Sequence, residues 1–207
     1  MNTTSQPDNA DLFTPLQGAD DDARRRLHRR LVDAAEAEGV LDVAYRTVDT
    51  AVGPLLLAAT DRGLVRVAYA RQDHDAVLQT LSTKVSPRIL RGGSRLDHAA
   101  REIEEYFAGR RQTFDLLLDL RLATGFRLGV LQHLPTIGYG RTESYSQVAT
   151  AAGSPRAVRA VGTACATNPL PVVVPCHRVV RSDGSLGEYA GGAEAKRTLL
   201  TLEGAAA

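Results

Sequence analysis

The sequence predicts an α+β protein in which a small α/β half is followed by a mostly helical half. Three observations lead to this fold class. Hydrophobic residues make up 43% of the 207 residues and charged residues 24%, which is enough apolar material for a packed core. Short apolar or alternating runs with turn signals between them begin at residue 41, which is typical of strands. After residue 125, cap and stop residues instead delimit short helices.

The composition excludes several classes of protein. A formal net charge of +1 gives no overall attraction to nucleic acid or membrane. The two cysteines, Cys165 and Cys176, are too few for a disulfide-rich secreted scaffold or a zinc site of four cysteines, so we expect no metal and no cofactor. The first residues are polar, and no apolar run approaches the roughly 18 residues of a membrane span. We therefore expect a cytoplasmic protein without a membrane partner.

Changes in composition along the chain predict three regions. They are a tail and helix over residues 1–40, an α/β domain over residues 41–122 and a C-terminal domain over residues 123–207. The polar tail extends to about Asp22, and the helix over residues 20–38 has acids at its start and a glycine at its end. The arginines in this helix could contact DNA, but a solvated helix face is the simpler interpretation.

The α/β domain is expected to combine short strands with two helices. Strands are predicted at residues 43–47, 55–59, 64–69 and 114–120. Helices are predicted at residues 74–82 and 96–108. The second helix is amphipathic, because its apolar residues recur at helical spacing. These apolar residues are Leu96, Ala99, Ala100, Ile103, Tyr106 and Phe107.

The C-terminal domain contains a predicted helix-turn-helix. After a helix over residues 126–134, Ser144 and Gln147 have the spacing of a capping box that opens a short helix. A second helix is expected over residues 155–166, with Ser154 as its N-cap and a proline at its first position. Two short helices joined by a tight glycine turn are typical of DNA-binding proteins, but also of many ordinary helix pairs.

The end of the chain is expected to alternate strand-like and turn segments before a last helix. The first is a β-branched, strand-like run at residues 172–180, which its prolines keep at a sheet edge or out of regular pairing. A wing-like turn at 181–184, a flexible loop at 187–192 and a helix at 193–202 follow. From residue 121 onward, nine basic residues outnumber five acidic ones, which could favour contact with phosphates.

Cys176 is the residue best suited to chemistry. A free thiol has a pKa near 8.5, so only about 3% is thiolate at pH 7, and a nucleophilic cysteine usually needs an imidazole beside it. His177 follows directly, although neighbours in a regular strand point to opposite faces unless Pro175 breaks the strand. The alternative is a buried cysteine beside a half-exposed histidine. Glu203 could orient His177 or be a solvated helix end, and Cys165 is expected in the core.

The segment Pro175-Cys176-His177-Arg178-Val179-Val180 resembles the signature of the O6-alkylguanine-DNA alkyltransferases, also called methylated-DNA–protein-cysteine methyltransferases. Further segments resemble the family in the expected order, namely residues 138–145, 154–162, 168–169, 187–192 and 202–204. The resemblance is strong over residues 126–204 and weaker over residues 41–120. It implies a ribonuclease H-like N-terminal domain and a winged helix-turn-helix C-terminal domain.

The resemblance also implies a function. The protein would bind double-stranded DNA, flip out an O6-alkylguanine or O4-alkylthymine, and transfer the alkyl group irreversibly to Cys176 in a single turnover. His177 would take the thiol proton through a water molecule, and Glu203 would orient His177. Tyr145 would protonate the guanine ring, and Asn168 would tie the recognition helix to the active-site strand. Cooperative self-association on DNA is the remaining expectation about partners.

The same resemblance identifies residues that would contact DNA or the alkyl group. Arg159 would fill the space left by the flipped base. The other DNA-facing residues would be Arg156, Ser154, Ser146, Ser182 and Arg127. The alkyl pocket would be lined by Tyr189, Ala190 and Pro171.

Three other functions are considered. A non-catalytic protein of the same fold would bind alkyl lesions without transfer, but such relatives lack the acceptor cysteine. A cysteine hydrolase would need an oxyanion hole and turnover, for which the sequence shows no sign. A transcriptional regulator would dimerise and prefer an operator sequence, which competition with random duplex would test.

Overall fold

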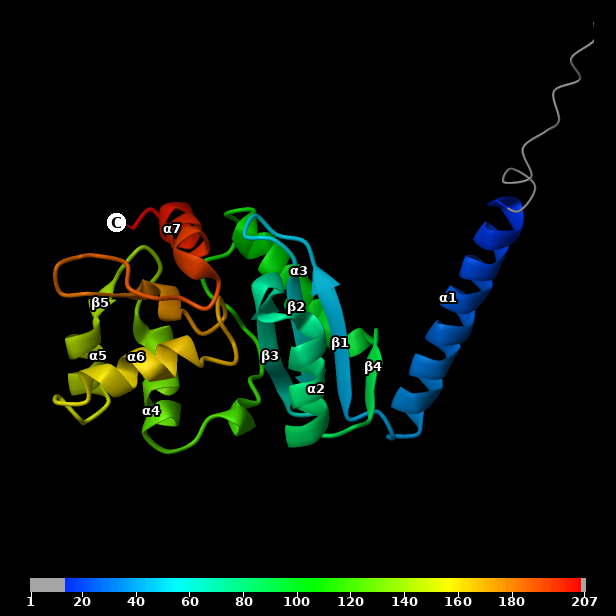
Figure 1. Cartoon of the computed structure of the whole chain (residues 1–207), viewed down its shortest axis with the longest axis horizontal. Helices are drawn as coiled ribbons and strands as arrows, with labels where there is room; N and C mark the ends of the chain where they lie inside the picture. The colour runs from blue at the N-terminus through cyan, green and yellow to red at the C-terminus, as the bar shows by residue number, and fades with distance from the viewer. Residues whose placement is uncertain (1–13, 206–207) are drawn as a thin grey trace, which may run out of the picture. The chain divides into compact units, whose positions relative to one another are not determined.

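The computed structural model describes residues 14–205 and divides the chain into two compact units, residues 1–41 and 42–207. The first unit contains helix α1 (Thr14–Ala37) (Figure 1). This helix begins six residues before the predicted start, because Thr14-Pro15 is itself a helix-start signal. The predicted tail is therefore wrong for residues 14–22, and its first thirteen residues lie outside the described part. The α1 arginines are exposed, which both a solvated face and contact with DNA require, so the choice between these two interpretations stays open.

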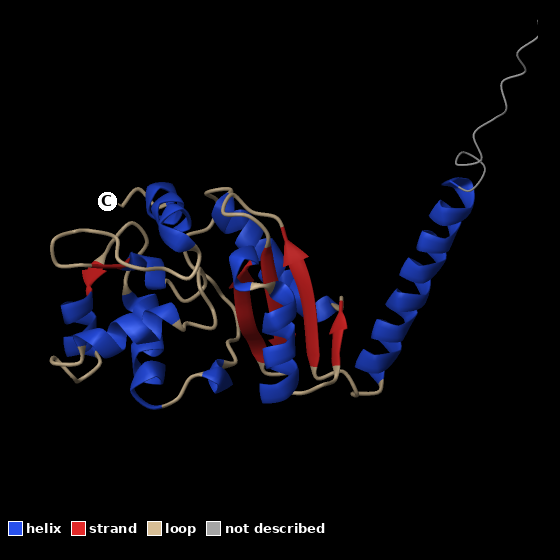
Figure 2. Ribbon diagram, in the orientation of Figure 1, coloured by secondary structure: helices blue, strands red, loops and turns tan. Residues whose placement is uncertain are grey.

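The second unit begins with a four-stranded sheet in the order β3-β2-β1-β4 (Figure 2). The strands are β1 (Val43–Val48), β2 (Leu55–Thr60), β3 (Gly63–Tyr69) and β4 (Ile89–Arg91). The first three form an antiparallel meander, as predicted, and β4 pairs in parallel with β1. Strand β4 was not predicted, because three residues are too few to show a strand pattern.

Two helices accompany the sheet. Helix α2 (His74–Lys84) covers one face, where its Val77 and Leu81 join buried residues of β1, β2 and β3 in one core cluster. Helix α3 (Asp97–Phe107) buries most of the predicted apolar face, although Phe107 itself is only partly buried. All six residues of β2 are buried, so both faces of the sheet are covered at this strand.

The predicted strand at residues 114–120 is wrong. This segment meets the sheet only at an isolated parallel bridge between Leu64 and Leu118. Leu117 accepts a 2.8 Å hydrogen bond from the Leu64 amide, and the Leu64 carbonyl accepts one from Asp119 at the same distance. The chain crosses the start of β3 closely enough that a Cβ at Gly63 would collide with the Leu117 carbonyl. An apolar run therefore forms a single crossing contact here instead of a ladder.

The C-terminal half is mostly helical. Its helices are α4 (Gly125–His133), α5 (Tyr145–Ala151), α6 (Val158–Ala166) and α7 (Gly192–Leu202), and the short strands β5 (Glu143–Ser144) and β6 (Val179–Val180) pair in parallel. The predicted capping box is confirmed, because Ser144 and Gln147 cap α5 reciprocally. Residues 42–207 form one compact unit, so the division near residue 122 stays a prediction.

One local prediction in this half is wrong, and one alternative is decided. Helix α6 begins at Val158 and not at residue 155, because the Ala157 amide donates to the Ser154 carbonyl and closes a turn first. Ala157, and not Ser154, is the N-cap residue. Of the two alternatives for residues 172–174, the structure shows the second: they form turns outside regular pairing, and Val172 has a positive φ of 74°. The surrounding prolines lack the N–H groups that a central strand needs.

No helix among the described residues is both long and apolar enough to cross a membrane.

Candidate active site and nucleic-acid interface

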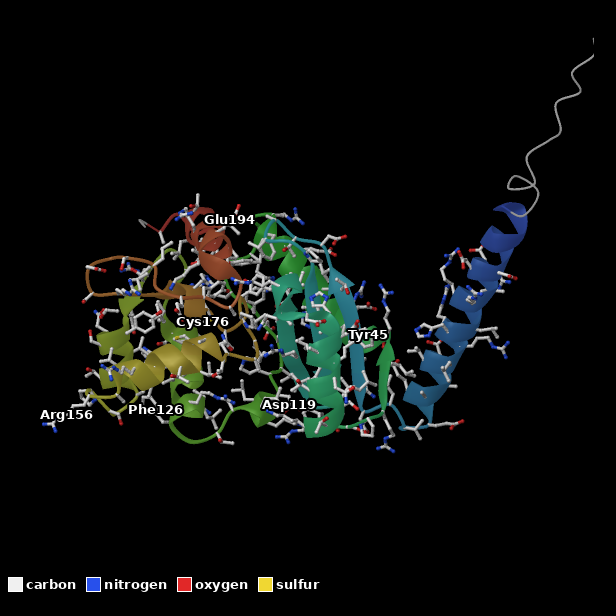
Figure 3. The ribbon with its side chains drawn as sticks, in the orientation of Figure 1. Tyr45, Asp119, Phe126, Arg156, Cys176 and Glu194 are labelled. Atoms are coloured by element: carbon white, nitrogen blue, oxygen red, sulfur yellow. The ribbon has the colours of Figure 1, made fainter. Side chains whose placement is uncertain are left out.

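Cys176 lies in a single 3-10 turn, Cys176–Arg178, which follows Pro175 and leads into β6. Of the two expectations for this segment, a regular strand or one broken at Pro175, the structure shows the second. Because the backbone is not extended here, Cys176 and His177 are both buried, with exposed fractions of 1% and 0%. The alternative of a half-exposed histidine is therefore wrong. Figure 3 shows Cys176 inside the C-terminal half, and Arg156 far from it at an outer edge.

Asn168 holds the cysteine turn against the end of α6. Its Nδ2 donates to Cys176 Sγ at 3.1 Å and to the Val174 carbonyl at 2.8 Å, and its Oδ1 accepts from the Leu170 amide at 2.9 Å. Burial raises the pKa of Cys176 to about 11, although the Asn168 hydrogen bond and the charge of Lys196 lower it. The group is thus a thiol at neutral pH, and it needs a base to become a nucleophile.

Lys196 brings a buried positive charge from α7 to the same region. Its Nζ donates to the Val179 carbonyl at 2.5 Å and to the Leu186 carbonyl, and it lies 6.0 Å from the centre of the Tyr145 ring. Burial lowers the pKa of Lys196. This lysine therefore fastens the segment that carries Leu186 to β6.

Glu203 accepts hydrogen bonds from four residues. Oε1 accepts from His177 Nε2 at 2.9 Å, from the Tyr106 hydroxyl at 2.7 Å and from Arg178 Nη2 at 2.9 Å. Oε2 accepts from Arg178 Nε at 2.9 Å and from the Gly140 amide at 3.3 Å. Burial alone would raise the pKa of Glu203, but these donors hold it at about 2. Glu203 is therefore a carboxylate at neutral pH.

The carboxylate fixes the tautomer of His177. Since an ionised carboxylate only accepts hydrogen bonds, Nε2 of His177 carries the proton and Nδ1 carries the lone pair. Nδ1 is buried and hydrogen-bonds to no residue that the structure describes. Burial lowers the pKa of His177 despite the opposing effect of Glu203. His177 is therefore a neutral imidazole whose free nitrogen can accept a proton.

Two tyrosines lie near the group formed by Cys176, His177 and Glu203. Tyr189 is buried and places its ring edge-to-face with His177, at 6.3 Å between centroids. Tyr145 is partly buried, and burial raises its pKa to about 12, so it stays protonated. Gly187 has a φ of 66° and passes so close that a Cβ there would lie 2.8 Å from the Tyr145 hydroxyl. Of the other predicted pocket residues, Pro171 is buried and Ala190 is partly buried.

The predicted DNA contacts do not all lie together. Arg159 is exposed in the first turn of α6, and Arg156 is exposed in the turn before it. Ser146 and Ser182 are also exposed, and Ser154 is partly so. Arg127 instead lies at the other end of α6, where it donates to Thr167 Oγ1 at 3.3 Å and to the Leu122 carbonyl.

Sequence reasoning missed three polar residues of the site: Tyr106, Arg178 and Lys196. Arg178 stands inside the signature and could have been suspected. Tyr106 resembled one more apolar residue of its helix, and its contact with Glu203 spans 97 positions in the sequence. Cys165 is buried, as predicted. Residues 14–205 contain no cluster of three side chains suited to a metal ion.

Comparison with known proteins covers both halves of the chain. The family model described as 6-O-methylguanine DNA methyltransferase, ribonuclease-like domain, matches residues 43–120, and the DNA binding domain of the same name matches residues 125–205. The chain is 40% identical over 161 residues to a methylated-DNA–protein-cysteine methyltransferase of Mycolicibacterium paratuberculosis, covering 78% of this chain and 92% of the relative. It is 39% identical over 163 residues to the constitutive methyltransferase of Bacillus subtilis, covering 77% and 94%.

The chain is also similar to solved structures of proteins with related names. The chain is similar to the crystal structure of Mycobacterium tuberculosis OGT in complex with DNA, with a TM-score of 0.68 and 38% identity over 78% of this chain and 92% of the other. It is similar to the O6-methylguanine methyltransferase of the same organism, with a TM-score of 0.69 and 38% identity over 78% and 93%.

Proposed function

The chain belongs to the 6-O-methylguanine DNA methyltransferase family, and from this premise we propose that Cys176 is the residue that takes the alkyl group. The protein repairs DNA by alkyl transfer, and DNA is its partner. The observation that supports Cys176 is its position beside a buried His177 whose Nε2 is held 2.9 Å from the Glu203 carboxylate. Cys165, the other thiol, has no such base next to it in the sequence.

In the proposed reaction, the thiol proton of Cys176 passes to Nδ1 of His177 through a water molecule. Glu203 stabilises the imidazolium that forms. The thiolate attacks the alkyl carbon, an S–C bond forms, and the C–O6 bond breaks with its electrons going to guanine. Tyr145 donates a proton to the departing guanine ring, which makes guanine a better leaving group. The product is a thioether that no group of the site can reverse, so each molecule acts once.

The substrate of this reaction is proposed to be O6-alkylguanine, with O4-alkylthymine as a second lesion. Because Cys176 is only 1% exposed, a base inside a duplex cannot reach it and must be flipped out. Arg159 is proposed to enter the space that the base leaves, while Arg156, Ser154, Ser146 and Ser182 contact the backbone. Arg127 is already bonded at the far end of α6, so we leave it out of this surface. Self-association on DNA and a cytoplasmic location stay predictions.

Intact mass spectrometry tests the assignment. The protein is mixed with an equimolar duplex that contains one O6-methylguanine, and its peptides are then mapped. We expect one added methyl group on the Cys176 peptide, restored guanine and no second turnover. Cys176→Ala should bind the duplex without transfer, whereas the matched variant Cys165→Ala should still transfer.

Two results would contradict the proposal. Transfer by Cys176→Ala would move the acceptor to another residue. Tight lesion binding by the wild type without any change of mass would favour the non-catalytic lesion-binding protein.

A further inference from the structure

Tyr69 connects the ribonuclease-like half to the proposed alkyl pocket. It is the last residue of β3, and its hydroxyl lies 2.9 Å from the hydroxyl of Tyr189. The two rings meet edge-to-face, with centroids 5.7 Å apart and an interplanar angle of 72°. Both side chains are buried, with exposed fractions of 2% and 8%. This contact joins residues that are 120 positions apart in the sequence.

The loop that carries Tyr189 is also held at its exit by the end of β3. A Cβ at Gly191 would lie 2.7 Å from atoms of the Tyr69 ring, and a Cβ at Gly192 would lie 2.5 Å from Arg71 Nη1. A side chain at Gly191 would collide with the Tyr69 ring, whereas the flexible end of Arg71 could move aside for one at Gly192. Gly191 therefore lets the loop backbone pack directly against the Tyr69 ring, two residues after Tyr189.

The hydroxyl pair is neutral and fully within the protein. Burial raises the pKa of Tyr69 and of Tyr189, so both phenols are protonated at neutral pH. One hydroxyl donates to the other, which sets the direction of the Tyr189 ring. The same ring also meets His177 edge-to-face, with 6.3 Å between centroids. Tyr69 is thus linked to His177, the proposed base, only through Tyr189.

We propose that Tyr69 determines alkyl specificity by holding Tyr189 as a rigid wall of the pocket. This inference rests on the proposed function, in which Tyr189 lines that pocket. A wall fixed by a hydrogen bond keeps a small alkyl carbon in line with the sulfur and leaves little room for a bulky group. Without the Tyr69 hydroxyl, the Tyr189 ring can swing, so a small group is positioned less well and a bulky group fits more easily.

The experiment compares transfer rates for two duplexes, one with O6-methylguanine and one with O6-benzylguanine. Tyr69→Phe keeps the ring and removes the hydroxyl. We expect the benzyl-to-methyl rate ratio to rise about fivefold, the factor that one net hydrogen bond is worth. Tyr45→Phe is the matched control, because Tyr45 lies in β1 and packs against the core on the α2 side (Figure 3). Its ratio should equal that of the wild type.

A double-mutant cycle separates positioning from a general structural effect. Tyr189→Phe breaks the same hydroxyl pair from the other side, so it should raise the ratio by a similar factor. In that background Tyr69→Phe should have no further effect on the ratio. An unchanged ratio in Tyr69→Phe, or an undiminished effect in the Tyr189→Phe background, would overturn the proposal. If the wild type transfers no methyl group at all, the proposed function fails instead.

Discussion

Glu203 is the single residue on which most of the candidate site depends. It lies at the C-terminal end of α7, and its one carboxylate accepts from the imidazole, a phenol, a guanidinium and a backbone amide. A buried charge is expensive to desolvate and is stable only when its partners are in place. The same contacts that set the His177 tautomer therefore also hold the C-terminal half together.

We predict that Glu203→Gln destabilises the protein strongly and slows transfer. Glutamine keeps the shape but leaves the Arg178 guanidinium buried without its counter-ion, which typically lowers the free energy of unfolding by about 3–5 kcal/mol. Urea titration measures this loss. The exposed Glu194 of the same helix is the control, and Glu194→Gln should change the free energy by less than about 0.5 kcal/mol (Figure 3).

The pH dependence of the free energy of unfolding also tests the role of the Glu203 carboxylate. The pKa of Glu203 is about 2 in the folded protein, below its ordinary value of 4.5, so the unfolded chain binds this proton more readily. The stabilisation is therefore present above about pH 4.5 and is lost as the pH falls toward about 2. Glu203→Gln should lack this component. An equal loss of stability in both proteins over this range would contradict the assignment.

Sequence reasoning named Cys176, His177, Asn168 and Glu203 as candidates but not the residues that complete their environment. His177 drew attention because it follows Cys176 directly, whereas the roles of Asn168 and Glu203 came from the family resemblance, because each has an ordinary structural reading by itself. Tyr106 could not be predicted, since its hydroxyl meets the carboxylate only after both halves have folded.

At the scale of elements, local signals such as helix caps predicted the structure well. Strand pairing between segments far apart in the sequence was not predicted as well. The capping box of α5 formed as predicted because all its partners lie within four residues. The strand predicted at residues 114–120 failed because its pairing depends on where the chain crosses β3, which its own composition does not encode. The start of α6 failed because Ser154-Pro155 suits a turn as well as a helix.

We predict that Ser144, before α5, and Ser154, before α6, differ in their effect on stability. Ser144→Ala removes the N-cap of α5 and should lower the free energy of unfolding by about 1 kcal/mol. Ser154→Ala should change it by less than about 0.5 kcal/mol, because Ser154 uses its backbone carbonyl and caps no helix with its side chain. Chemical denaturation measures the free energy of unfolding of both variants. An equal decrease in both would mean that Ser154 caps α6 and that this helix starts at residue 155.

At the scale of residues 42–207, polar contacts make the two halves one structure. The amide of Val67 on β3 donates to the Pro169 carbonyl at 2.8 Å, and Tyr69 meets Tyr189. Tyr106 of α3 supplies one of the hydrogen bonds to Glu203. The ribonuclease-like half therefore contributes to the site a hydroxyl donor that the C-terminal half would otherwise lack.

This dependence predicts that residues 42–207 unfold in one transition. The chain has no tryptophan, so tyrosine fluorescence is the optical signal, and transfer activity is measured at each urea concentration. Both should decline with the same midpoint. Tyr106→Phe should lower that midpoint without splitting the transition, because a hydrogen bond to a charged group is worth about 1.5–3 kcal/mol, whereas Tyr45→Phe should not shift it by a comparable amount. A separate early transition through which transfer persists would mean that the C-terminal half holds Cys176, His177 and Glu203 in place without help.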